Sequence, residues 1–160
     1  MKQFAPFDQR PLLVAIAGPN GAGKTTFYHA HLESAGLRFI NADVLARELN
    51  FETVFSDSAR DKLGFLKEAV QSGYTVALCY IGLASPEISG ERVAMRVSQG
   101  GHDVPAGKLK SRSAIRELPH VLVYDNSDLR HPFRRIAVFH NGRPVYRSKR
   151  VPKWFNRIDS

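Results

Sequence analysis

The chain has 160 residues, of which 43% are hydrophobic, and this length and composition predict one domain with a single substantial core. Its one cysteine excludes an internal disulfide, and no apolar stretch approaches the roughly 20 residues of a membrane-spanning helix. The N-terminus lacks the apolar core of a signal peptide, so we expect a cytoplasmic protein, and the formal net charge of +8 raises the question of a polyanionic partner.

The first expected strand, 12–17, is an apolar run that we expect to be fully buried. The eight residues after it, GPNGAGKT at 18–25, fit the phosphate-binding loop pattern G-x-x-x-x-G-K-[ST], and a helical pattern follows over 24–35. Backbone N–H groups of such a loop, with the positive end of the following helix, bind nucleotide phosphates. An ordinary glycine-rich corner is the alternative, which the lysine and threonine at the fixed positions disfavour.

Each residue type in this loop has a predicted task. The glycines supply a backbone without side-chain obstruction, Lys24 is expected to reach the β- and γ-phosphates, and the Thr25 hydroxyl is expected to hold Mg2+. The predicted nucleotide site consists of Gly18, Asn20, Gly21, Ala22, Gly23, Lys24, Thr25 and Thr26.

Two further strands are expected at 38–41 and 51–55, with part of 42–49 helical. Asp43 follows the first of them, and ligands of open α/β sheets bind beyond the carboxyl ends of strands. This carboxylate can accept the proton of an attacking hydroxyl, hold Mg2+ through water or cap the next helix, and we favour the catalytic role. Further candidates near the loop are Glu52 and Thr53.

A helix is expected at 59–72, a strand at 75–81 and a second helix at 86–99. Cys79 lies within the apolar run of that strand and is expected to be a core thiol. Arg92 and Arg96 are four residues apart, so they share one face of the second helix. They suit the neutralisation of a transferring phosphoryl group, or they face solvent as helical charges commonly do.

The strand expected at 120–124 leads into Asp125, as a Walker B strand does, and Asp125, Asn126 and Ser127 are candidates to approach the loop. We expect this strand at an edge of the sheet, distant from the phosphate loop. We therefore favour a nucleotide-proximal or capping role for Asp125 over a Mg2+ role.

The net positive charge lies near the C-terminal end, where a hairpin is expected around the turn signal Asn141-Gly142. Residues 129–158 contain nine basic side chains and no acidic one, with Tyr146, Trp154 and Phe155 interleaved, a mixture typical of nucleic-acid-binding surfaces. A solvated edge hairpin explains the same residues, because lysine and arginine on edge strands deter edge-to-edge pairing. We favour the hairpin, so nucleic acid is not an expected partner. Its strands are expected at 133–139 and 143–146.

Five segments resemble, in this order, those of zeta-toxin-type P-loop kinases: AGPNGAGKTT at 17–26, INAD at 40–43, ETVFS at 52–56, RVAMRVSQGGHDVP at 92–105 and VYDNS at 123–127. The resemblance covers 12–142 and leaves 143–160 as a basic tail of the same domain. It implies the α/β fold of a P-loop NTPase, a three-layer sandwich with a mainly parallel sheet, here ending in a C-terminal β-hairpin. It also implies a bacterial kinase that uses ATP or GTP and Mg2+ to phosphorylate a sugar hydroxyl of UDP-N-acetylglucosamine, and it admits an antitoxin-like protein partner.

The resemblance also implies roles for single residues. Asp43 corresponds to the catalytic base, and Lys24 and Arg96 complete the catalytic set, with Arg96 clamping a phosphate. The implied substrate-binding residues are Glu52, Thr53, Arg92 and Arg112.

Two places are shorter than the family pattern. Only nine residues separate the second and third expected strands, whereas a parallel crossover with its helix needs at least about 10 to 12 residues. A stretch that the family carries near Arg112 is also truncated. We predict that segments are missing between Asn50 and Phe51 and within 112–114. The alternatives to a kinase are a nucleotide-binding protein with impaired catalysis and a nucleotide-gated nucleic-acid binder that uses the tail.

Overall fold

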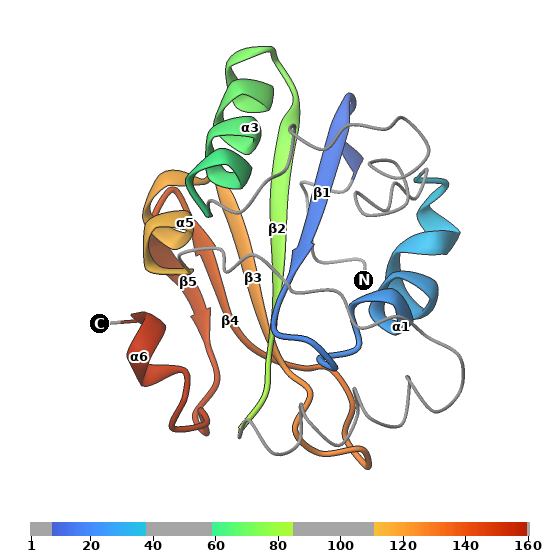
Figure 1. Cartoon of the computed structure of the whole chain (residues 1–160), viewed down its shortest axis with the longest axis vertical. Helices are drawn as coiled ribbons and strands as arrows, with labels where there is room; N and C mark the ends of the chain where they lie inside the picture. The colour runs from blue at the N-terminus through green and yellow to red at the C-terminus, as the bar shows by residue number, and fades with distance from the viewer. Residues whose placement is uncertain (1–7, 38–58, 85–110, 160) are drawn as a thin grey trace.

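The computed structural model describes residues 8–37, 59–84 and 111–159, which form a five-stranded sheet in the order β1-β2-β3-β4-β5 (Figure 1). The strands are β1 (Leu12–Ala17), β2 (Thr75–Gly82), β3 (His120–Asp125), β4 (Arg134–His140) and β5 (Arg143–Arg147). β2 pairs in parallel with β1 and β3, whereas β4 pairs antiparallel with β3 and β5. The described sheet is therefore mixed and not mainly parallel, because the C-terminal hairpin contributes two antiparallel pairings.

These strands confirm the three expected at 12–17, 75–81 and 120–124 and the C-terminal hairpin. The hairpin turns at Asn141 and Gly142, both with positive φ, as the Asn-Gly turn signal predicts. The other expected elements, strands at 38–41 and 51–55 and helices within 42–49 and 86–99, lie outside the described residues.

The helix expected at 24–35 is confirmed as one continuous helical run whose winding changes twice. It consists of α1 (Lys24–Phe27), the π-helical η2 (Tyr28–Leu32) and the 3-10 helix η3 (Glu33–Ala35). The helix expected at 59–72 is confirmed as α3 (Ala59–Gln71), which ends before Gly73 with its φ of +87°. No helix in the described ranges is long and apolar enough to cross a membrane.

Two helices were not predicted, α5 (Ser111–Glu117) and α6 (Asn156–Asp159), because elements this short carry too little apolar periodicity. α5 also shows that the prediction of a missing segment within 112–114 is wrong. The helix runs unbroken through these residues, and the N–H of Leu118 donates to the carbonyl of Ala114 at 3.0 Å. The other predicted break, between Asn50 and Phe51, lies outside the described residues.

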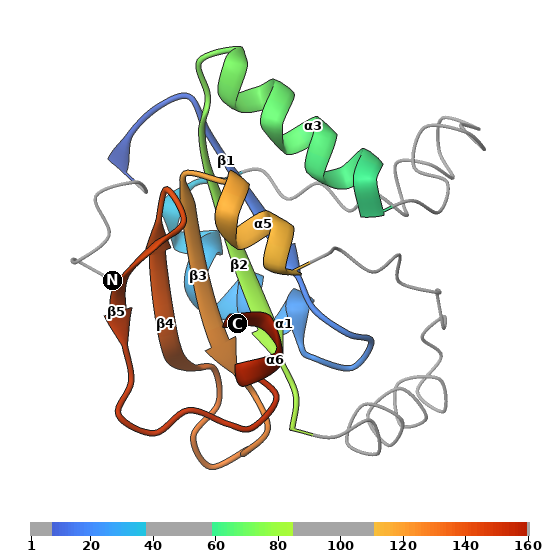
Figure 2. The same ribbon diagram turned by 90° about the vertical axis from the view of Figure 1, so that its left-hand side faces the viewer.

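The side chains of β2 and β3 alternate between two hydrophobic cores, as the period of a strand requires. Val76 and Val121 belong to the core that packs against α3 and α5, whereas Ala77 and Leu122 belong to the core against α1 and η2. Figure 2 shows α3 and α5 in front of the strands and the helical run after β1 behind them. The described residues therefore form three layers, helix, sheet and helix.

Three expectations about single strands can be compared with this packing. Cys79 is buried in the second core, which confirms the core thiol, and burial raises its pKa to about 12. β1 is only half-buried along its length, so the expectation of full burial is wrong; among the described strands only β2 pairs with it. β3 lies between β2 and β4, so the expectation that it forms an edge of the sheet is also wrong.

The aromatic residues of the C-terminal tail are used mainly inside the protein. Trp154 and Phe155 are buried in the core that contains α3 and α5, and the ring of Phe155 also lies 5.3 Å from the guanidinium of Arg147. Tyr146 is exposed, with the guanidinium of Arg135 at 4.8 Å from its ring. Two of the three tail aromatics are therefore not available to stack on bases.

Trp154 packs directly on the end of β2, which gives a test of this packing. A Cβ at Gly82 would overlap three ring carbons of Trp154, and the ring cannot move without opening the core. We expect Gly82→Ala to lower the free energy of unfolding by about 1–3 kcal/mol, because overpacking displaces neighbouring groups. Gly64→Ala is the matched control: a Cβ there meets nothing within 4 Å, so the change should raise the helix stability of α3 by about 0.5–1 kcal/mol. Urea unfolding measures both, and equal effects would contradict this packing.

A histidine pair lies across the β3–β4 ladder, at the end of the sheet where β3 begins. His120 and His140 are register partners, with their Nδ1 atoms 3.2 Å apart and their ring centroids 4.9 Å apart. One ring can donate to the other only while one of the two facing nitrogens is unprotonated. Burial, and to a lesser extent the charge of His140, lower the pKa of His120.

This lowered pKa predicts a loss of stability in mild acid. The unfolded chain binds the proton of His120 more tightly, so this contribution to stability is complete above the unfolded pKa of about 6.5 and falls as the pH drops below it. We expect the difference in urea midpoint between pH 7.5 and pH 5 to be larger for the wild-type protein than for His120→Gln. The same pH dependence in both proteins would exclude a contribution from His120.

Candidate nucleotide site

Residues 18–25, called the glycine loop below, connect β1 to α1 and lie against the ends of β2 and β3. A Cβ at Gly18, where φ is +153°, would overlap the carbonyl oxygen of Ile81 on β2. A Cβ at Gly23, where φ is +89°, would lie 2.9 Å from Nδ2 of Asn126, the residue after β3. Both positions therefore require glycine, for their backbone conformation and for the close approach of the loop to the sheet.

The glycine loop and the residue after it contribute a cation and two hydroxyl groups. Nζ of Lys24 folds back to donate to the carbonyls of Gly18 at 2.9 Å and Pro19 at 3.2 Å, while the N–H of Ala22 donates to Pro19 and closes a turn. Thr25 and Thr26 are exposed in the first turn of the helix. The predicted nucleotide-site residues thus lie together. The ammonium group of Lys24 lies beside the loop backbone, and both are expected to bind phosphate.

Asn126 joins the glycine loop to the rest of the sheet. Its side chain is buried, Nδ2 donates to the carbonyl of Ala22 at 2.8 Å, and Oδ1 accepts from the N–H of Phe133 at 3.2 Å. Its own N–H donates to the carbonyl of Gly82 at 3.0 Å. The expected approach of residues 125–127 to the loop is therefore confirmed at Asn126. The expectation that this strand lies far from the loop is wrong, because β3 is an inner strand and the residue after it contacts Ala22.

Sequence reasoning named Asn126 as a polar residue beyond a strand but assigned it no role. The signal was its place after an apolar run, which marks a ligand-facing sheet edge in α/β folds. Its link to Ala22 joins residues 104 positions apart, and such contacts follow from tertiary packing.

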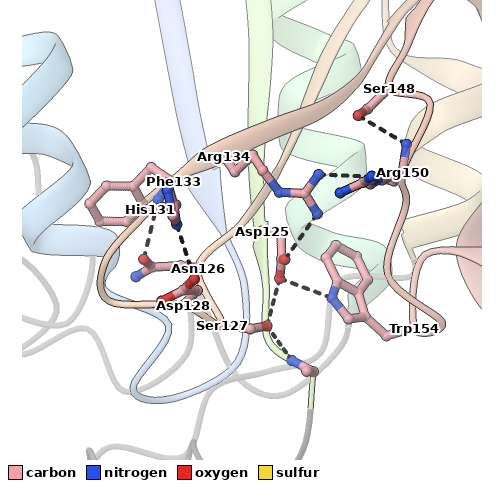
Figure 3. Close-up of polar contacts among 11 residues, drawn as sticks. Asp125, Asn126, Ser127, Asp128, His131, Phe133, Arg134, Ser148, Arg150 and Trp154 are labelled. Atoms are coloured by element: carbon pink, nitrogen blue, oxygen red, sulfur yellow. Dashed lines mark hydrogen bonds and ion pairs between the residues drawn. The ribbon is translucent and has the colours of Figure 1, made fainter.

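Asp125 turns toward the tail (Figure 3). Its Oδ1 accepts from Oγ of Ser127 at 2.6 Å and from Nε1 of Trp154 at 3.2 Å, and its Oδ2 lies 3.5 Å from Nη2 of Arg134. Ser127 in turn accepts from the N–H of Ala84 at 2.7 Å. Both carboxylate oxygens thus contact donors of the protein, and none of these donors is the N–H of a helix start, so the contacts show neither the nucleotide-proximal nor the capping role expected for Asp125. They favour a structural role that holds the tail over a Mg2+ role.

An aromatic cluster holds the helix after the glycine loop against β3 and the loop that follows it. The ring of Phe27 lies 4.9 Å from that of Tyr124 and 5.3 Å from that of Phe133, and His31 lies 5.7 Å from Phe133. Burial raises the pKa of Tyr124 and lowers that of His31, so both remain neutral at pH 7. Phe133 itself has a φ of +52° next to the hydrogen bond from its N–H to Asn126.

The other predicted site residues are not brought to the loop by described structure. Arg112 lies on α5 and donates through Nε to the carbonyl of Arg157 at 2.7 Å, which ties α5 to α6. The remaining residues assigned to catalysis or to substrate lie outside the described residues: Asp43, Glu52, Thr53, Arg92 and Arg96.

Comparisons with known proteins give one structural likeness. No family model matches the sequence, and no curated protein matches it. One chain of the crystal structure of AvrRxo1-ORF1:-ORF2 with ATP is similar with a TM-score of 0.59 and 15% identity, over 94% of this chain and 64% of that one. The chain thus spans less than two thirds of its neighbour, and at this identity the likeness shows a shared α/β fold.

The contacts of Asp125 predict a graded loss of stability. Asp125→Ala removes the acceptor of the buried Trp154 Nε1 and should cost about 1–3 kcal/mol of unfolding free energy, because a buried donor is left unpaired. Asp125→Asn keeps an oxygen for that bond and loses the charge facing Arg134, so the cost should stay below about 1 kcal/mol. Urea unfolding measures both, with Glu68→Ala, at an exposed acidic position on α3, as control. Equal losses in the two Asp125 variants would contradict this assignment.

Proposed function

We propose that this chain is a P-loop phosphotransferase of the zeta-toxin type, which transfers the γ-phosphoryl group of ATP or GTP to a hydroxyl of a small molecule. The observation that carries the proposal is the glycine loop, held at the ends of β2 and β3 with Lys24 folded across it. Backbone N–H groups, an ammonium and a helix start gathered in this way suit polyphosphate. The likeness to a structure crystallised with ATP supports the same ligand.

Different groups of the glycine loop would bind the phosphates and Mg2+. The N–H groups and Lys24 bind the phosphates, and the exposed hydroxyl of Thr25 would hold Mg2+. When bound, Mg2+ neutralises charge on the phosphates. Asp125 is left out of this set, because Trp154, Ser127 and Arg134 contact its two oxygens.

The acceptor and its residues come from the sequence resemblance. Asp43 takes the proton of the attacking hydroxyl while the new P–O bond forms and the bond to the β-phosphate oxygen breaks. Arg96 clamps phosphate, and the acceptor is UDP-N-acetylglucosamine, bound by Glu52, Thr53 and Arg92. Arg112 is left out of this set, because its Nε donates to the carbonyl of Arg157 and ties α5 to α6. The neighbour's crystal structure holds ORF1 together with ORF2, which supports including an antitoxin-like protein among the proposed partners.

We expect the protein to transfer label from γ-labelled ATP with Mg2+ to UDP-N-acetylglucosamine within a panel of sugar nucleotides. Lys24→Met should slow transfer by at least about 100-fold, because it removes a cation that stabilises charge on the transferring group. Lys67→Met is the matched control, since Lys67 is exposed on α3 and pairs with Glu117. Asp43→Asn should slow transfer by about 100-fold or more and leave ATP binding intact.

The binding measurement separates this proposal from its alternatives. ATP binding by calorimetry without transfer to any sugar nucleotide would replace the kinase by a nucleotide-binding protein with impaired catalysis. No ATP binding would contradict both. The burial of Trp154 and Phe155 gives the nucleic-acid alternative no support.

A further inference from the structure

The direction of one peptide plane in the glycine loop decides whether an N–H faces the phosphate site. The carbonyl of Ala22 and the N–H of Gly23 belong to the same planar trans peptide, so they point in opposite directions. Nδ2 of Asn126 holds the Ala22 carbonyl at 2.8 Å, toward the buried end of β3. The N–H of Gly23 must therefore point away from Asn126 and the end of β3.

Without such a hydrogen bond the peptide has little to keep it in this orientation. Turning the plane over changes mainly ψ of Ala22 and φ of Gly23, and glycine adopts positive and negative φ about equally well. Gly23 cannot be replaced by a stiffer residue, because its φ is +89° and a Cβ would press on Asn126. Because position 23 must be glycine, the peptide plane between Ala22 and Gly23 can turn over unless a neighbouring group fixes it.

Asn126 is itself fixed on both sides. Oδ1 accepts from the N–H of Phe133, and the backbone N–H donates to Gly82 at the end of β2. Phe133 packs against Phe27 in the first turn of the helix after the loop. The amide group that holds Ala22 is therefore anchored to the sheet and cannot follow the loop if the loop relaxes.

We infer that Asn126 is a positioning residue that directs the N–H of Gly23 at bound phosphate by holding the Ala22 carbonyl, an inference that rests on the proposed function. The ligand class is the polyphosphate of a nucleoside triphosphate. Asn126 makes its contribution through Gly23, without contacting the reacting atoms. A donor aimed in advance binds phosphate without reorganising the loop.

The test compares Asn126→Ala, Asn126→Asp and Val121→Ala. Asn126→Ala removes both side-chain bonds, whereas Asn126→Asp keeps the acceptor for Phe133 and replaces only the donor to Ala22. Val121→Ala is the control, because Val121 is buried at the opposite end of β3, so the change destabilises the protein without touching the loop.

We expect ATP with Mg2+ to bind about tenfold more weakly to Asn126→Ala, as the loss of one hydrogen bond predicts, and at least that much more weakly to Asn126→Asp, whose carboxylate repels the Ala22 carbonyl. Binding to Val121→Ala should be unchanged. In the transfer assay the KM for nucleotide should rise while the KM for acceptor stays constant, a split that general loss of stability does not produce. The 1H–15N signal of Gly23 in the free protein should shift in the Asn126 variants and stay in place in Val121→Ala.

The outcomes separate this inference from the proposed function. If the wild-type protein and both Asn126 variants bind ATP with the same affinity, the inference is overturned and the kinase proposal stands. If the wild-type protein binds no ATP, the proposed function fails and this role for Asn126 fails with it. A Gly23 signal that does not respond to either Asn126 substitution would overturn the geometric argument, whatever ATP does.

Discussion

The described structure depends on the end of β3, where two neighbouring polar residues, Asp125 and Asn126, make hydrogen bonds on opposite faces of the sheet. Successive residues of a strand face opposite sides of the sheet. Asp125 accordingly accepts from Trp154 in one core, and Asn126 donates to Ala22 in the other. Both side chains are buried, so leaving either without its partners would cost a desolvation penalty. The tail and the glycine loop are thus joined through two adjacent residues.

This arrangement also gives two of the nine basic residues in 129–158 a structural role. Arg134 lies between the carboxylate of Asp125 and the carbonyl of Arg150, and Arg147 pairs with Asp159 beside the ring of Phe155. A planar guanidinium can contact a carboxylate, a carbonyl and a ring face, which a compact ammonium does less well. Arg134 on β4 and Arg147 in the tail are therefore used to hold the tail on the sheet, and a basic composition alone does not indicate a polyanionic partner.

The elements that sequence reasoning predicted well are those specified by neighbouring residues. The apolar runs of β1, β2 and β3, the Asn-Gly turn of the hairpin and the glycine spacing of the loop each reflect sterics or periodicity within a few residues. The short helices α5 and α6 were missed because so few residues show no reliable period. The break predicted within 112–114 was wrong because a comparison of lengths with a family pattern cannot distinguish a missing segment from a continuous short helix.

The sequence by itself determined the glycine loop together with the strand before it and the helix after it. Only glycine tolerates the backbone conformation and the close contacts at positions 18 and 23, and the lysine and threonine follow at fixed spacing. It also determined that Cys79 would be a core thiol. Only the tertiary structure decided that β3 lies inside the sheet, that β1 is half-buried and that Asn126 reaches Ala22. These features depend on which strands become neighbours, and that order follows from burying the two faces of the sheet under helices that are distant in sequence, which no local pattern records.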